Sequence, residues 1–149
     1  MEQLNFDSGV QEYQINGNGV LRFNPSDPNV YARFMESTEK IQKVEKEMVA
    51  KATALNRDSA IVGEEVLTIM RETDQKMKAI LNEIFGHEND FDKLLENVNL
   101  MAVATNGERV ITNLIAALQP IMEAGAKSCV GTEVNAAKFN REQRRAMNR

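Results

Sequence analysis

The side chains of this 149-residue chain that could hold a cation lie around its one histidine. His87 is followed by Glu88, Asp90 and Asp92. A zinc site normally needs three or four Cys, His or carboxylate ligands, so this set could in principle bind a metal. Acidic residues here also suit a helix N-terminus, because they interact favourably with the helix dipole. We favour the second interpretation, in which these residues close one helix and open the next, and predict no metal site.

The other candidate catalytic groups lack suitable partners. Cys129 is the one cysteine, and no histidine lies near it in the sequence, which argues against an activated nucleophile. Glu64 and Glu65 are adjacent, and adjacent residues of a helix point about 100° apart, so they do not form an acid and base pair. Residues 17–19 read Gly-Asn-Gly, without the remainder of a phosphate-binding loop. The sequence therefore predicts no catalytic residue, no cofactor and no enzyme activity.

The distribution of charge separates the end of the chain from the rest. The whole chain has 18 Lys and Arg against 22 Asp and Glu. Residues 138–149 carry five cations and one anion, so residues 1–137 carry 13 cations and 21 anions, a net charge of -8. An acidic body is not typical of nucleic-acid-binding domains, which are usually strongly basic. We expect a basic tail that orders on meeting an acidic partner, with Arg141, Arg144 and Arg145 as partner-binding residues.

Two short segments of alternating apolar and polar residues predict a β-hairpin within residues 10–23. Their apolar residues are Tyr13, Ile15, Leu21 and Phe23. Residues 16–19 between them read Asn-Gly-Asn-Gly, and both residue types tolerate the positive φ of tight hairpin turns. A two-stranded hairpin is only marginally stable alone, so one face should lie on helices or on a neighbouring subunit.

A long helix is predicted to follow the hairpin. Asp27 suits the N-cap and Pro28 the first helical position, and no further Pro or Gly occurs before about Asn56. Four apolar residues recur at every seventh position of this segment: Phe34, Ile41, Met48 and Leu55. A helix of about 29 residues would be roughly 44 Å long. We expect part of this stripe to contact another helix, in the same subunit or in another one.

A second helix should follow a short connection. Residues 56–59 can end the first helix and cap the next. The apolar face of the second helix includes Met70 and Met77. Gly86 is placed to end it, because glycine readily adopts the positive φ found after a helix.

Two more helices are predicted before the basic tail. Asp90 caps a short third helix over residues 91–98. Residues 105–108 have the Thr-x-x-Glu form of a capping box and open a fourth helix. Pro120 lies inside the pattern of that helix and should kink or divide it. Beyond Gly131 the apolar pattern fades.

These elements predict a mainly α fold with a short N-terminal β-hairpin (α+β), in which a long helix is joined by three or more further helices and a basic C-terminal tail. We expect residues 1–9 to be a flexible N-terminus, residues 10–130 to form a single domain, and residues 131–149 to be a mobile tail. One cysteine excludes an internal disulfide framework. There is no secretory signal and no run of about 18 apolar residues, so we expect a cytoplasmic protein that does not cross a membrane.

The order of these motifs resembles that of small tail assembly chaperones of long-tailed bacteriophages and prophages of Gram-positive hosts. The similarity spans roughly residues 12–149. Its motifs are the hairpin, the segment Phe23-Asn24-Pro25-Ser26-Asp27 before a long charged helix, Ile84-Phe85-Gly86, and Asn140-Arg141-x-x-Arg144-Arg145.

The resemblance implies a cytoplasmic, non-enzymatic protein that acts during virion assembly and is absent from the finished particle. Such chaperones coat the aggregation-prone, helical tape measure protein and help to recruit tail tube subunits around it. Many of these families also make a longer form by ribosomal frameshifting near the end of the reading frame.

A chaperone for a long helix needs apolar surfaces that accept varied partners, and methionine side chains adapt well to such a task. The candidate partner-binding residues are Phe34, Ile41, Met48, Leu55, Met70 and Met77. We expect some of them to be exposed or to lie at the interface of a homo-oligomer. The alternative is that all of them form an ordinary core.

Two other functions stay open at this point. The first is a homo-oligomeric structural component of the same particle, which would use the hairpin edge and the long helix to build a ring. The second is a helical regulator whose basic tail binds nucleic acid, which the acidic body makes the weaker alternative.

Overall fold

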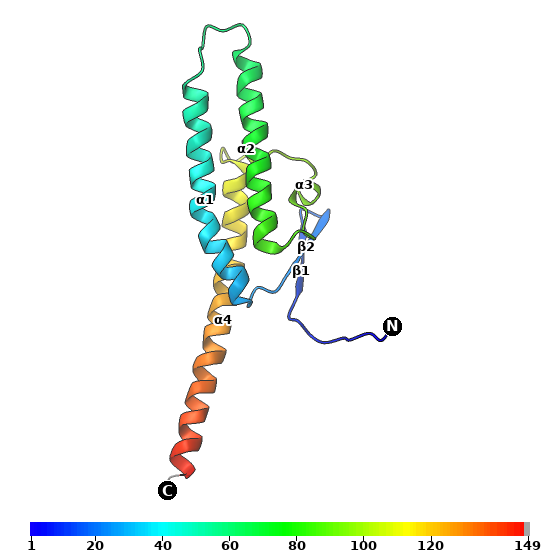
Figure 1. Cartoon of the computed structure of the whole chain (residues 1–149), viewed down its shortest axis with the longest axis vertical. Helices are drawn as coiled ribbons and strands as arrows, with labels where there is room; N and C mark the ends of the chain where they lie inside the picture. The colour runs from blue at the N-terminus through cyan, green and yellow to red at the C-terminus, as the bar shows by residue number, and fades with distance from the viewer. Residues whose placement is uncertain (148–149) are drawn as a thin grey trace.

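The computed structural model describes residues 1–147 of the chain and is mainly helical (Figure 1). Its elements, in chain order, are β1 (Gln11–Ile15), β2 (Gly19–Phe23), α1 (Pro28–Thr53), α2 (Val62–Phe85), α3 (Phe91–Leu94) and α4 (Val110–Met147). The predicted fold class, mainly α with an N-terminal β-hairpin, is confirmed. No helix of the described residues is long and apolar enough to cross a membrane.

The hairpin forms as its sequence predicts. β1 and β2 pair antiparallel, with Tyr13 opposite Leu21. Asn16 and Gly17 have φ values of 49° and 79°, and the carbonyl of Ile15 accepts a hydrogen bond of 2.9 Å from the backbone N–H of Asn18. The left-handed conformation at both turn residues explains why Asn and Gly are needed there.

The hairpin lies on the helices of its own chain, at the end of α2. Phe23 is buried and its ring centroid lies 4.7 Å from that of Phe85. The backbone of Arg22 is held from the side by Asn89, which accepts a hydrogen bond from its N–H at 2.9 Å and donates one to its carbonyl at 2.8 Å. The same side-chain amide also donates to the carbonyl of Phe85. These bonds occupy the outer edge of β2 and join the hairpin to α2.

α1 and α2 form an antiparallel helical hairpin whose connecting loop lies at one end of the molecule (Figure 1). Asp27 caps α1 as predicted, because its carboxylate accepts a bond of 2.9 Å from Asn29 N–H. The predicted cap of α2 at residues 56–59 is wrong. Asn56 and Ser59 accept bonds from the N–H groups of Asp58 and Ile61 instead, and these turns delay α2 until Val62.

Gly86 ends α2 with a φ of 99°, as predicted. Asp90 caps α3 by accepting a hydrogen bond from Asp92 N–H, but this helix stops at Leu94 and does not reach residue 98. Glu96 and Asn97 adopt positive φ values of 52° and 62°, which cannot continue a right-handed helix.

A buried ion pair holds the segment between α3 and α4 against α2. Lys78 Nζ lies 2.9 Å from Asp74 Oδ2 and 2.6 Å from Asp92 Oδ1. The other carboxylate oxygen of Asp74 accepts a bond of 2.8 Å from Leu100 N–H. Burial lowers the pKa of Lys78, but the bonds and charges of the two carboxylates outweigh burial, so its pKa lies above the ordinary 10.5.

α4 differs most from the prediction. The capping box of residues 105–108 does not form, because residues 103 and 109 pair as an isolated bridge and the chain turns between them, so the helix begins only at Val110. The helix then continues through Pro120, so of the predicted kink or division the division does not occur. Proline has no N–H, so the carbonyl of Ala116 has no helical hydrogen-bond donor. Both residues are exposed, so water can bind this carbonyl instead.

The predicted mobile tail is helical over the described residues. Residues 131–147 continue α4, which stands away from the body at the end opposite the α1–α2 loop (Figure 1). Arg149, counted in the basic tail, lies outside the described residues.

The core lies where α1, α2, α3, the first half of α4 and the hairpin meet. Its fully buried side chains include Leu21, Met77, Leu81, Phe91, Leu100, Met101 and Met122. α4 lies very close to the segment before α1 at Gly125, where a Cβ atom would lie 1.8 Å from the carbonyl oxygen of Pro25. Only glycine allows the helix to lie this close.

Candidate helix-binding groove

The predicted stripe on α1 faces inward. Phe34, Ile41 and Met48 are 3%, 6% and 6% exposed, and Met77 of α2 is fully buried. These four side chains fill the core between α1 and its neighbouring helices, as the alternative of an ordinary core expects for them. Leu55 and Met70 are half-buried near the α1–α2 loop.

A second row of side chains on α1 borders a groove. Its members follow the spacing of three and four residues of one helix face: Tyr31, Met35, Thr38, Gln42, Glu45 and Val49. Met35 and Val49 are each 51% exposed. The facing row belongs to the first half of α4 and consists of Ile111, Thr112, Ile115, Ala116, Gln119 and Met122. We call the space between these two rows the α1–α4 groove.

The α1–α4 groove is continuous along α1. Its cavity at the Tyr31 end measures about 250 Å³ and the middle cavity about 430 Å³, and the two share Thr38, Ile115 and Gln119. Beyond Glu45, a shallow hollow beside Val49 is lined by α1 alone and includes the charged Lys46. From Tyr31 to Glu45, where both helices line the groove, α1 rises about 21 Å, the length of about four helical turns. The groove therefore has the length and straightness that a bound helix requires.

The walls of the groove carry little charge. Residues 110–122 of α4 contain no charged side chain. Glu45 is paired with Arg109, whose Nε lies 3.5 Å from its carboxylate, and Glu123 lies at the Tyr31 end. Ile41 and Ile115 give the middle an apolar floor, whereas Gln42 and Gln119 can both donate and accept hydrogen bonds. This arrangement can bind an amphipathic helix but offers no reactive group.

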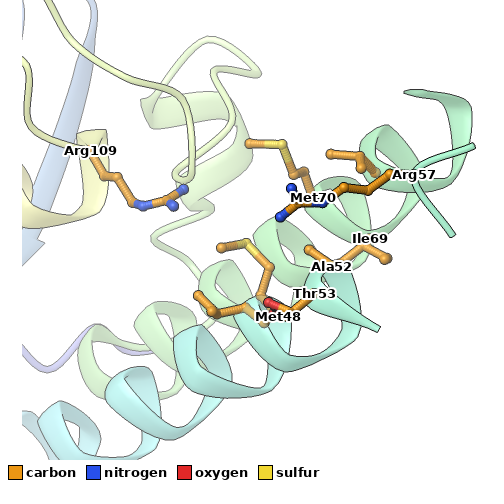
Figure 2. Close-up of a pocket in the computed structure, with 9 residues that line it drawn as sticks. Met48, Ala52, Thr53, Arg57, Ile69, Met70 and Arg109 are labelled. Carbon is orange, nitrogen blue, oxygen red and sulfur yellow. Dashed lines mark hydrogen bonds between the residues drawn. The ribbon is translucent and has the colours of Figure 1, made fainter. Parts of the chain in front are cut away.

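A smaller cavity, which we call the tip pocket, lies at the other end of α1 (Figure 2). It measures about 310 Å³. Its apolar lining comes from both arms of the helical hairpin: Met48, Val49, Ala52, Val66, Ile69 and Met70. Thr53 and two arginines, Arg57 and Arg109, complete it. Of the residues predicted to bind partners, Met48 and Met70 line this pocket.

The basic residues of α4 lie apart from both cavities. Arg141, Arg144 and Arg145 are exposed, and their spacing of three and four residues places them on one side of the helix. They stand on the part of α4 that extends beyond the body (Figure 1).

The acidic residues near His87 have structural roles. Asp90 caps α3, and Asp92 pairs with Lys78. Within residues 1–147, no group of three or more His, Cys, Asp or Glu side chains is placed to hold a metal ion. Cys129 is half-buried on α4.

The sequence prediction missed the α1–α4 groove because its residues are moderately polar and come from distant parts of the chain. The signal that could have revealed it is the uncharged run of residues 110–122, in which Thr112 and Ala116 are nonetheless exposed. Comparisons of the chain with protein-family models, with curated proteins and with solved structures find no match. We therefore infer function from the groove and from the resemblance in motif order.

Proposed function

We propose that this protein is a phage tail assembly chaperone that binds the tape measure protein and helps to recruit tail tube subunits. The α1–α4 groove is the observation that carries this proposal. It is long, straight, apolar at its floor and open to water, and it matches one face of an amphipathic helix. The resemblance in motif order supplies the identity of the client.

A helix is the client that the groove fits best. Two helices packed side by side leave a channel into which a third can place residues at positions i, i+3, i+4 and i+7. Ile115 would contact such anchors at the floor, and Met35 and Val49 would cover them from the rim. Flexible Met side chains and uncharged Gln side chains accept many sequences, as a chaperone for a long and varied helix requires.

In this proposal the protein acts in the host cytoplasm, without a catalytic step or a cofactor, and leaves before the virion is complete. Arg141, Arg144 and Arg145 provide a second contact, toward acidic surfaces of the client or of the tube subunit. Their attraction would weaken as salt increases, whereas binding in the groove would depend much less on salt.

Co-purification with a helical fragment of the tape measure protein tests the proposal. Ala116→Glu places a charge in the groove, and Ala79→Glu makes the same change at an exposed residue of α2 outside it. We expect the fragment to elute with the wild-type chain and with Ala79→Glu, and Ala116→Glu to reduce its binding at least tenfold. Absence of binding by the wild-type chain, or equal binding by the two variants, would contradict the proposal.

A homo-oligomeric structural component of the tail is the second candidate, and the free-standing part of α4 favours it. Residues 126–147 form about six helical turns beyond the core, and most helices in proteins are stabilised by packing, which a neighbouring subunit would supply here. Stable incorporation of the protein into purified particles would favour this candidate over the chaperone.

A further inference from the structure

The first eight residues, which we call the N-terminal arm, expose two large apolar side chains. Leu4 is 87% exposed and Phe6 is 77% exposed. The arm runs away from the body without folding back onto it (Figure 1). Side chains two residues apart lie on one face of an extended chain, so Leu4 and Phe6 can enter one apolar surface together. Their neighbours Glu2 and Asp7 give the arm two carboxylates.

The base of the arm is fixed. Asn24 donates a hydrogen bond of 3.0 Å to the carbonyl of Ser8. Gly9 has a φ of 74°, and its N–H donates to the carboxylate of Asp7 at 2.8 Å. A Cβ atom at Gly9 would lie 2.6 Å from the Asn24 side chain, so the turn requires glycine. The arm therefore leaves the body from a defined point near the start of α1.

The tip pocket has the complementary chemistry. Met48, Ile69 and Met70 line it, and Arg57 and Arg109 extend toward it from opposite sides (Figure 2). No carboxylate lines it. Arg109 is partly neutralised by Glu45, whereas Arg57 makes no ion pair or side-chain hydrogen bond with the described residues. The pocket thus joins an apolar lining to an available positive charge.

We propose that the tip pocket receives the N-terminal arm of a second copy of this chain. Leu4 and Phe6 bury their side chains against Val49, Ile69 and Met70, and the carboxylates of Glu2 and Asp7 pair with Arg57 and Arg109. Both the apolar surface and the sign of the charges match, and within the described residues of one chain Leu4 and Phe6 stay exposed and Arg57 forms no ion pair.

The arm cannot reach the tip pocket of its own chain. Its base lies near the start of α1, and the pocket begins at Met48, 20 residues further along the helix, about 30 Å away. From the anchored Ser8 to Leu4, a fully extended chain spans at most about 14 Å. A second copy placed in the opposite direction brings its arm to this end, and a two-fold axis then lets each copy give one arm and receive one.

Sedimentation of the full chain over a range of concentrations tests the proposal. We expect a monomer–dimer equilibrium that is lost in the double variant Leu4→Ser, Phe6→Ser. Arg57→Glu should weaken the dimer at least tenfold. Arg71→Glu makes the same change at an exposed residue of α2 that does not line the pocket, and it should leave the dimer unchanged.

A charge swap makes the test specific. The variant Arg57→Glu and the variant Glu2→Lys, Asp7→Lys should each dimerise poorly alone, and mixing them should restore the dimer to within about threefold of the wild type. A wild-type chain that stays monomeric at every concentration would overturn the proposal. So would a dimer that the arm and Arg57 variants leave unchanged, since another surface would then hold it together.

Discussion

Gly125 brings α4 against Pro25, in the segment that precedes α1. Replacing it with alanine would place a methyl group 1.8 Å from the Pro25 carbonyl oxygen, so the helix or the Asn24–Pro25 segment must move. Overpacking of this kind typically costs about 1–3 kcal/mol. We expect Gly125→Ala to lower the urea midpoint of unfolding, although alanine is the better helix former. Gly131→Ala is the control: nothing lies within 4 Å of its Cβ position, and the midpoint should stay equal or rise.

Lys78 makes the stability of the fold depend on pH in the alkaline range. Its pKa in the folded chain lies above the ordinary 10.5, because two carboxylates hold the ammonium group. The charged form is therefore favoured by folding, and its contribution is complete below pH about 10. As pH rises through the folded pKa, this contribution is lost. We expect the free energy of unfolding, measured by urea titration, to fall as the pH rises above about 10.

Lys78→Met separates this effect from general alkaline unfolding. Removing one partner of a buried ion pair costs about 3 kcal/mol, so the variant should be less stable at neutral pH. Its free energy of unfolding should then fall less above about pH 10 than that of the wild-type chain. Parallel pH profiles for the two proteins would show that the ion pair does not stabilise the fold.

At the scale of elements, the local signals in the sequence predicted most of the fold. Asp27, Gly86 and Asp90 act within a few residues of their own positions, so their roles could be recognised without tertiary structure. The start of α4 depends on the bridge between residues 103 and 109. The capping-box pattern of residues 105–108 falls inside this bridged turn, so it does not mark the start of the helix. The helix over residues 131–147 lacks an apolar period, and the prediction of a mobile tail followed from that lack.

The candidate site was harder to predict than the elements. The heptad stripe correctly marked an apolar face of α1, but only the positions of α2 and α4 decide that Phe34 and Ile41 are covered. The open face lies one row further round α1, where Thr38 and Gln42 look like ordinary surface residues. A groove made by two helices far apart in sequence becomes visible only when they are placed together.

The free-standing part of α4 should not support the rest of the fold. A chain ending at Lys127 keeps Gly125 and the whole core but loses the exposed end of the helix. We expect it to unfold at the same urea concentration as the full chain, within about 0.5 kcal/mol, while its helical circular dichroism decreases. A clearly lower midpoint would mean that residues 128–147 pack on the body.

The three surfaces of the molecule follow one another along its length. The tip pocket lies by the loop between α1 and α2, the groove runs along the middle, and the basic end of α4 stands at the opposite pole (Figure 1). Residues 1–137 carry a net charge of -8, so the charge of the molecule is also divided along this axis. An elongated protein of this kind can contact a rod-shaped client and its own neighbours at the same time.

Protection of single thiols by the client tests the central proposal most directly. Cys129 is the one native cysteine, so Cys129→Ser removes the background, and Ala116→Cys or Ala79→Cys then places one thiol inside or outside the α1–α4 groove. The tape measure fragment should slow modification of the thiol introduced at position 116 at least tenfold and leave that at position 79 unchanged. Equal rates at both positions with the fragment bound would show that the client does not lie in the groove.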